Sequence, residues 1–234
     1  MRAGIAGRVA AALFALLALG FVLPAAKVIP ELARLRAKAP PLRLRLELFI
    51  EDEATAREIR AEVHPDLGVR LWDGSGGRWW VREGELLSAR GRAPQPNWVP
   101  DLGLLRLRAE PAIWRRLDRA GIDTDRNQLG RCGDADCFVI GGRQGSAQLW
   151  IDKDRFEIRR LVLATGRRVE FEDWRDWDGQ RFPGSIRVRD ARGGLATLEV
   201  REVTPDPALG PEGFSAGWVR ESPVPPSAPG ALGP

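Results

Sequence analysis

Apolar and polar residues alternate strictly along residues Leu42–Leu48, which read LRLRLEL. Because successive side chains of a β-strand point to opposite faces, this alternation predicts a strand with one buried face. Further short strands are predicted along most of the chain, separated by glycine-rich or polar turns. They cover residues 57–65, 69–74, 78–84, 85–91, 128–132, 137–142, 147–152, 156–165, 167–179, 182–190 and 195–204.

Two segments have helical patterns instead. Residues 28–37 (VIPELARLRA) form a short predicted helix that ends before Pro40 and Pro41. Residues 110–123 carry a proline in the first turn, apolar residues at helical spacing and a glycine near the end, which predicts a second helix. Residues 93–101 contain three prolines and are predicted to be a loop, and the pattern of residues 102–107 is ambiguous.

The order of these elements predicts an α+β fold that is mainly antiparallel β. A curled sheet of about ten strands is expected to approach closure as a half-closed β-barrel, because large twisted sheets rarely stay open and flat. Two or three helices would cover its open face. Such a shape encloses a cavity that a ligand could occupy.

The first residues carry arginines, and the run Val9–Leu23 is apolar without interruption before Ala25 and Ala26. This order is that of a secretory signal peptide. Pro24 is a poor residue for a cleavage site, so an uncleaved N-terminal anchor is an alternative. We expect a periplasmic protein with a signal peptide or inner-membrane anchor (1–26), which would give membrane association if retained. A domain (27–220) and a disordered proline-rich tail (221–234) follow.

Charge is nearly balanced along the chain. There are 36 basic and 32 acidic residues, and the two arginines of the N-terminal segment account for part of the excess. Basic and acidic residues are interspersed, whereas a nucleic-acid-binding protein gathers its basic residues on one face. We therefore expect no nucleic-acid partner.

Cys132 and Cys137 enclose only Gly-Asp-Ala-Asp. In an exported protein, two strand ends joined by four turn residues favour a disulfide bond that closes a hairpin. Their spacing is longer than that of a redox Cys-x-x-Cys pair, and no neighbouring histidine suggests a zinc site.

Catalytic motifs are absent from the sequence. The glycines of segment 141–145 lead into a strand and not a helix, which indicates a hairpin turn and not a nucleotide-binding loop. His64 is the single histidine, and no nucleophile motif accompanies it. Asp173, Asp176 and Asp178 lack calcium-loop spacing, and they give only weak support to a hydrolase of an envelope polymer. We expect no catalytic residue, no metal and no cofactor.

The chain has nine tryptophans and no tyrosine. Trp79 and Trp80 are adjacent on a predicted strand and should face opposite sides of the sheet. Trp174 and Trp177 should also face opposite sides if their strand is regular. Large aromatic residues on both faces require cover on both faces, or they line a concave apolar pocket.

Four stretches together resemble a known family. They are FVIGG (138–142), QLWIDKDRF (148–156), VEFEDW (169–174) and RFP (181–183). In this order they resemble the C-terminal half of LolA-like proteins, the periplasmic carriers and relatives of the LolA/LolB superfamily. The resemblance covers residues 118–203, with weaker agreement over residues 27–91.

The resemblance implies a half-closed antiparallel barrel with a helical lid and an apolar interior that binds acyl chains of lipids or lipoproteins, without enzymatic activity. Family carriers use an arginine near the early strands in ligand handling. Three positions compete for that role here, namely Arg43, Arg45 and Arg57.

The favoured hypothesis is therefore a carrier-like envelope protein that binds acyl chains of lipid or lipoprotein. The chains would lie between the concave face of the sheet and the helices near Leu32 and Trp114. An alternative is a protein-interaction or sensing module on the same fold, with an envelope protein as its partner. The candidate cavity residues are Leu44, Leu46, Leu48, Trp72, Trp80, Trp114, Phe138, Trp150 and Phe171.

Overall fold

The computed structural model describes residues 23–51, 53–91, 102–143 and 145–221. Twelve of the described strands form one antiparallel sheet in the order β5-β4-β3-β2-β1-β14-β13-β10-β9-β8-β7-β6, and β11 pairs with β12 in a separate hairpin. The sheet has two open edges, β5 and β6. The prediction of a mainly antiparallel, half-closed α+β fold is confirmed, with two strands more in the sheet than expected.

The strands of the first half of the sheet are β1 (Leu42–Ile50), β2 (Arg57–His64), β3 (Gly68–Asp73), β4 (Arg78–Arg82) and β5 (Glu85–Arg90). Those of the second half are β6 (Asn127–Cys132), β7 (Ala135–Gly141), β8 (Gln148–Asp152), β9 (Ile158–Val162), β10 (Arg168–Glu172), β13 (Ser185–Arg189) and β14 (Leu195–Pro205). The separate hairpin is β11 (Arg175–Trp177) and β12 (Gln180–Phe182). The helices are α2 (Ala25–Arg36), α3 (Glu110–Arg119), α4 (Ala216–Glu221) and the 3-10 turns η2 (Leu102–Leu105) and η3 (Pro211–Gly213).

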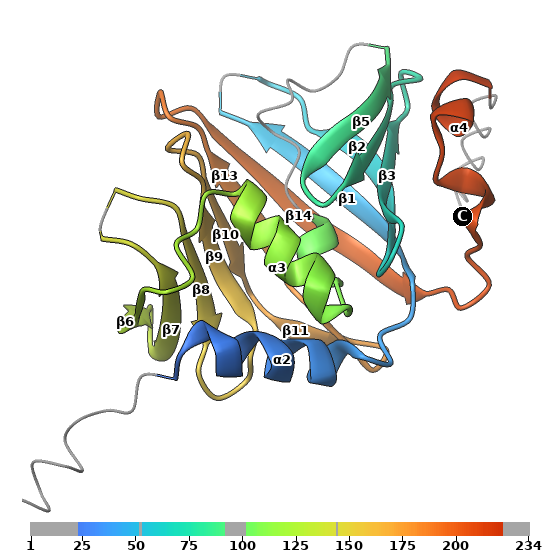
Figure 1. The fold of residues 1–234 in the computed structure, drawn as a ribbon. Coiled ribbons are helices and arrows are strands. Elements are labelled where there is room, and N and C mark those ends of the chain that lie inside the picture. The colour runs from blue at the N-terminus through green and yellow to red at the C-terminus, as the bar shows by residue number, and fades with distance from the viewer. Residues whose placement is uncertain (1–22, 52, 92–101, 144, 222–234) are drawn as a thin grey trace, which may run out of the picture.

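Three irregularities in strand pairing help to curl the sheet. The register shifts between β1 and β14, between β4 and β5, and between β8 and β9, and the extra residue of each shift lies on β14, β5 and β9, respectively. A bulge bends its strand and increases the local twist. The sheet therefore forms a hollow on one side, which Figure 1 shows from the side of α3.

The chain itself covers this hollow. After β5, at one edge of the sheet, the chain passes through η2 and α3 before it begins β6 at the other edge. Figure 1 shows α3 across the hollow and α2 along one end of it, and the two helices contact each other. The cover therefore belongs to the same chain as the sheet.

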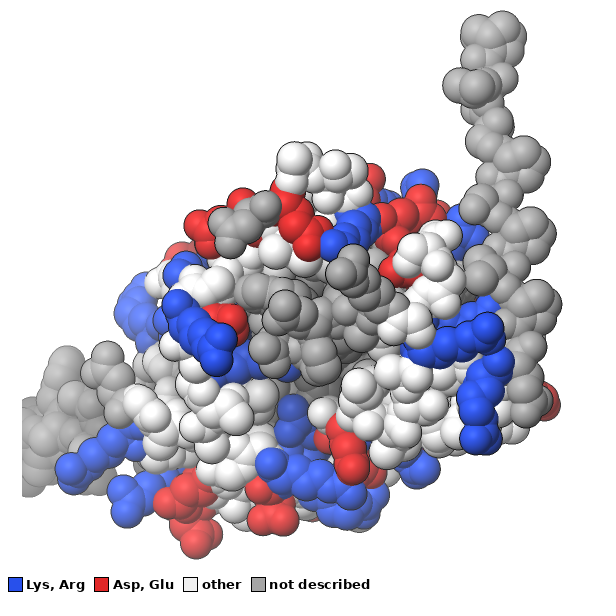
Figure 2. Space-filling view, turned by 90° about the horizontal axis from the view of Figure 1, so that it is seen from above, with Lys and Arg blue, Asp and Glu red and all other residues white. Residues whose placement is uncertain are grey.

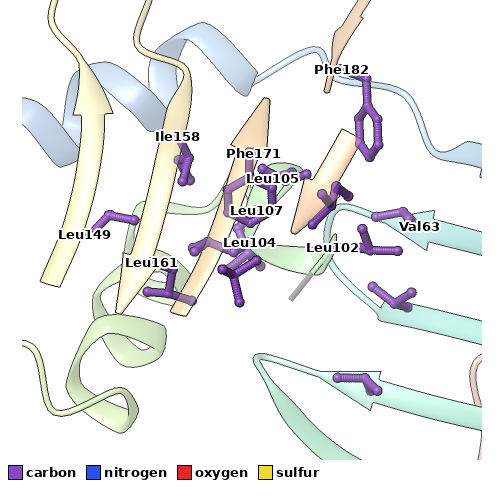
Figure 3. Close-up of a cluster of buried hydrophobic side chains, with 14 of the residues drawn as sticks. Val63, Leu102, Leu104, Leu105, Leu107, Leu149, Ile158, Leu161, Phe171 and Phe182 are labelled. Atoms are coloured by element: carbon purple, nitrogen blue, oxygen red, sulfur yellow. The ribbon is translucent and has the colours of Figure 1, made fainter. Parts of the chain in front are cut away.

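The concave face and its cover share one apolar core. Leu42, Leu44, Leu46 and Leu48 of β1 are all buried, and the residues between them are more exposed, as their alternation predicts. Figure 3 shows side chains of the η2 segment, including Leu104, pointing toward those of the strands. Burial of each large apolar side chain stabilises the fold by about 1.5–3 kcal/mol.

Two predicted strands are wrong in their extent. The segment 167–179 is divided, because β10 ends at Glu172 and Asp173 has a left-handed backbone with φ of 52°. The expectation for Trp174 and Trp177 therefore does not apply, and both pack against the core. The segment 182–190 is likewise divided between the end of β12 and β13.

The N-terminal helix is longer than predicted. Helix α2 begins at Ala25, before the predicted domain boundary, and Ala25 is buried in the core. The ambiguous segment after residue 101 contains the 3-10 turn η2. The predicted loop 93–101 and the proline-rich tail from residue 222 lie outside the described residues, as does the N-terminal segment up to residue 22. Within the described ranges, no helix has the length and apolar character to span a membrane.

Cys132 and Cys137 form the predicted disulfide bond, with their Cα atoms 6.2 Å apart. The bond closes the β6–β7 hairpin at the edge of the sheet. The loop that it closes is short, so in the chain-entropy account it stabilises the fold by about 2 kcal/mol.

Replacement of Leu46 by alanine tests the shared core. Leu46 is fully buried between the sheet and its cover, so Leu46→Ala should lower the free energy of unfolding by about 3 kcal/mol. The matched control is Leu87→Ala on β5, because Leu87 is 41% exposed; its effect should stay below about 0.5 kcal/mol. Urea denaturation of both variants measures the difference, and equal effects would contradict the described core.

Candidate functional site

A pocket of about 300 Å³ opens at the end of the hollow, beside the C-terminal end of α2. We call it the α2 pocket. Its walls come from α2, the chain after η2, the β8–β9 turn and the β11–β12 hairpin. Its apolar lining residues are Leu32, Leu35, Leu105, Phe156 and Trp174. Its charged lining residues are Arg36, Lys38, Arg106, Arg155, Glu157 and Arg181.

Asp152 organises the turn that forms one wall of the α2 pocket. Its buried carboxylate accepts hydrogen bonds from the backbone N–H of Asp154 (3.0 Å) and Arg155 (2.9 Å) and from the guanidinium of Arg159 (2.8 Å). Burial alone would raise the pKa of Asp152, but these hydrogen bonds outweigh burial and lower it. The turn is therefore fixed by an ionised carboxylate.

This turn presents Phe156 to the pocket. The backbone N–H of Phe156 donates to the carbonyl of Asp152 at 2.9 Å, and Phe156 has φ of 55°. A bulky residue seldom adopts this left-handed conformation, which costs on the order of 1–3 kcal/mol. The ring of Phe156 lies 6.0 Å from that of Phe138 in the core. The surrounding structure thus holds an aromatic side chain at the pocket in a conformation that its own backbone disfavours.

Glu157 ties two walls of the pocket together. Its carboxylate accepts hydrogen bonds from Nε (3.0 Å) and Nη2 (2.6 Å) of Arg181, in β12, and forms an ion pair with Arg159 at 3.0 Å. Beside it, the indole N–H of Trp174 donates to the carbonyl of Phe171 at 3.2 Å. The single carboxylate of the pocket lining is therefore already neutralised by two arginines.

Arg36 and Arg106 lie at the pocket without such a partner. Nη1 of Arg36 donates to the carbonyl of Leu104 (2.7 Å), and Nη2 of Arg106 donates to the carbonyl of Pro40 (2.8 Å) and to the side-chain oxygen of Gln180 (3.2 Å). Burial lowers the pKa of Arg36 to about 9, with a further contribution from the charge of Arg106, and burial lowers the pKa of Arg106 to about 10. Both guanidinium groups remain charged at neutral pH.

A larger pocket of about 610 Å³ lies on the outer face of β1, β2, β3 and β14. Its arginines are paired with carboxylates: Arg43 lies 2.7 Å from Asp206, and Arg45 lies 3.5 Å from Glu202. Arg57, the third position that competed for the role of a ligand-handling arginine, is paired with Glu53 at 2.5 Å. The arginines of this outer pocket are therefore neutralised by neighbouring carboxylates.

Charge is also mixed elsewhere on the molecule. Figure 2 shows basic and acidic side chains interspersed on the face seen from above. By contrast, the α2 pocket is lined by five basic residues and one acidic residue. Its positive charge is therefore a local feature.

Six of the nine predicted cavity residues meet in the core. Trp114, on α3, is partly buried against the same core, and its indole N–H donates to Glu110 at 3.1 Å. The other five face the cover of the hollow and are at most 4% exposed: Leu44, Leu46, Leu48, Phe138 and Phe171.

The other three, Trp72, Trp80 and Trp150, lie on the opposite face of the sheet. Trp72 packs edge-to-face on Trp218 of α4, with ring centroids 5.9 Å apart, and the guanidinium of Arg160 lies 4.7 Å from the ring of Trp150. Trp80 donates its indole N–H to the carbonyl of Leu67 at 3.3 Å. Trp79 and Trp80 do face opposite sides, as predicted, and Trp79 is the inner one.

None of the nine predicted cavity residues lines the α2 pocket, and the sequence analysis placed only Leu32 of its lining near the expected ligand. The stretch WIDKDRF, which supplies Phe156, drew attention only through the family resemblance. The other residues come together only through the fold. The lining residues not predicted as site residues include Leu35, Arg36, Leu105, Arg106, Phe156 and Trp174.

No family model and no curated protein matches this chain. Solved structures are similar to it in fold. A LolA superfamily protein from Nitrosomonas europaea is 12% identical with a TM-score of 0.49, over 84% of this chain and 99% of that one. A putative outer membrane lipoprotein-sorting protein domain from Vibrio parahaemolyticus is 11% identical with a TM-score of 0.45, over 81% and 97%. A DUF1329 family protein from Desulfovibrio piger is 13% identical with a TM-score of 0.48, over 85% and 100%.

The description of the first structure names the superfamily that the sequence resembles. At these identities and TM-scores the similarity concerns only the general arrangement of the sheet and helices.

Replacement of Asp152 by asparagine tests the turn. The lowered pKa means that the Asp152 carboxylate stabilises the fold above its ordinary pKa of about 3.9, and that this contribution is lost as the pH falls through the lower pKa of the folded state. Asp152→Asn should therefore lower the free energy of unfolding by about 2 kcal/mol at pH 7 and by less at about pH 3, which lies below the ordinary pKa. Asp154→Asn, at an exposed position in the same turn, is the control. Denaturation at both pH values measures the effect, and a loss that is equal at both would contradict this role.

Proposed function

We propose that this chain is an exported envelope protein that binds an acyl chain of a lipid or lipoprotein at the α2 pocket, in the manner of a carrier. One observation carries the proposal. Apolar side chains from four separate parts of the fold line one opening, and Leu35 among them is 52% exposed. A leucine that is half exposed inside a concave apolar wall is available to a ligand.

Helix α2 is suited to act as the movable side of this pocket. No side chain caps its N-terminus, its first turn has no acidic residue, and Pro30 interrupts its hydrogen bonding. Its stability must therefore come from packing its buried face, chiefly Val28, Ile29 and Leu32, against the core. That burial is worth roughly 6 kcal/mol for the three side chains.

The α2 pocket is too small for a long acyl chain unless α2 moves. At about 300 Å³ it lies at the lower end of the range of small-molecule sites, which is about 300–1,000 Å³. A long acyl chain therefore needs α2 to shift outward, so that the chain continues along the concave face toward Leu104 and Phe171. Each methylene group that is buried there contributes about 0.8 kcal/mol, which offsets the lost contacts of α2.

The proposal requires binding and no chemical step. The N-terminal sequence, with basic residues before an apolar run, supports export to the periplasm. The α2 pocket, whose apolar wall opens beside a helix, is suited to bind a lipid in that compartment.

Replacement of Leu35 by asparagine tests the apolar wall. Because Leu35 is half exposed, Leu35→Asn should leave the unfolding temperature nearly unchanged and weaken binding of decyl maltoside about tenfold, through loss of apolar contact. The matched control is Leu87→Asn, which removes a leucine that is 41% exposed from the edge strand β5. Isothermal titration calorimetry below the micelle concentration measures both. If the native protein does not bind the detergent, or if both variants bind it as the native protein does, the proposed site is wrong.

A further inference from the structure

Arg36 and Arg106, which we call the arginine pair, are an unusual feature of the α2 pocket. Arg36 is the last residue of α2, and Arg106 directly follows η2 and is only 6% exposed. The groups that accept hydrogen bonds from them within the described ranges are neutral, namely the carbonyls of Leu104 and Pro40 and the side-chain oxygen of Gln180. Nε of Arg106 is buried and has no hydrogen-bond partner among the residues that the structure describes.

The surroundings of the pair do not supply a counter-ion. No carboxylate of the described residues lies within ion-pair distance of either guanidinium, in contrast to the paired arginines of the outer pocket. Glu157, the acidic residue of the lining, is occupied by Arg159 and Arg181. Lys38 and Arg155 at the rim add further positive charge.

Such an arrangement is unfavourable for stability alone. A buried charge without a counter-ion loses hydration, and two like charges in one pocket repel each other. Neutral amide side chains could donate to the same carbonyls without this cost. A guanidinium adds planar, paired N–H donors that match the oxygens of a phosphate or carboxylate. A bound anion would complete the hydrogen bonding of Arg106 and neutralise both charges.

We propose that the arginine pair binds the anionic head group of an amphiphile, a phosphate monoester or a carboxylate, whose acyl chain lies against Leu35, Phe156 and Trp174. The inference rests on the proposed function for the acyl chain and adds the charge class of the ligand. Apolar and cationic residues line the same opening, so a head group at the arginine pair leaves the chain directed along the apolar wall.

Three ligands with the same decyl chain test the charge class. Decyl phosphate, decyl maltoside and decyltrimethylammonium are titrated into the full-length protein below their micelle concentrations, and inorganic phosphate is titrated separately. Decyl phosphate should bind at least about tenfold more tightly than decyl maltoside, because hydrogen bonds to a charged group are the stronger ones. The cationic ligand should bind most weakly, and inorganic phosphate should bind far more weakly than decyl phosphate.

Substitutions of Arg36 and Arg106 test whether the arginine pair causes the preference for decyl phosphate. Arg36→Gln and Arg106→Gln should each weaken decyl phosphate binding about tenfold and leave decyl maltoside binding unchanged. Arg36→Lys and Arg106→Lys keep the charge and should retain part of the preference. The matched control is Arg34→Gln, since Arg34 lies on the exposed side of α2 and is paired with Glu31. Thermal unfolding checks that each variant is folded, and the comparison of ligands on the native protein does not depend on any variant.

The outcomes separate this inference from the proposed function. If the native protein binds decyl phosphate and decyl maltoside equally well, the acyl site stands and the anionic head group is wrong. A preference for decyl phosphate that survives both glutamine variants would also overturn the role of the pair. If inorganic phosphate binds as tightly as decyl phosphate, or if none of the decyl ligands binds, the proposed function fails and the inference fails with it.

Discussion

The pairing of β1 with β14 holds this molecule together. It extends over nine residue pairs and joins the two halves of the chain into one sheet of twelve strands. A twisted sheet of that size curls, and its concave apolar face must then be covered. The segment that crosses from β5 to β6, together with α2, provides the cover. The α2 pocket lies where this cover ends, so its position follows from the topology.

The pairing of charged side chains differs between the outer face of the sheet and the α2 pocket. On the outer face, arginines such as Arg43 and Arg45 pair with carboxylates and leave a balanced surface. Arg36 and Arg106 depart from that rule at a site where apolar side chains are also accessible. Phe156 departs from another rule in the same place, because its backbone is left-handed. Departures of this kind concentrate at sites that bind ligands.

The sequence contains enough information for the strands and much less for the site. Alternation along β1 predicts its buried leucines because the period of a strand is fixed by geometry. The same rule shows that Trp79 and Trp80 face opposite sides, but it does not say which side is concave, and Trp80 lies on the outer one. Arg36 and Arg106 are far apart in the sequence and come together only through the fold. No local sequence pattern indicates that two distant residues lie at the same site in the fold.

Mass spectrometry of the organic extract of the native protein would show whether the α2 pocket holds an acyl chain. The full-length protein is purified without detergent from cells that export it, with its Cys132–Cys137 bond formed. We expect about one anionic amphiphile with an acyl chain per protein molecule. An extract without lipid, from folded protein whose unfolding temperature no added lipid raises, would contradict this expectation and favour a protein partner instead.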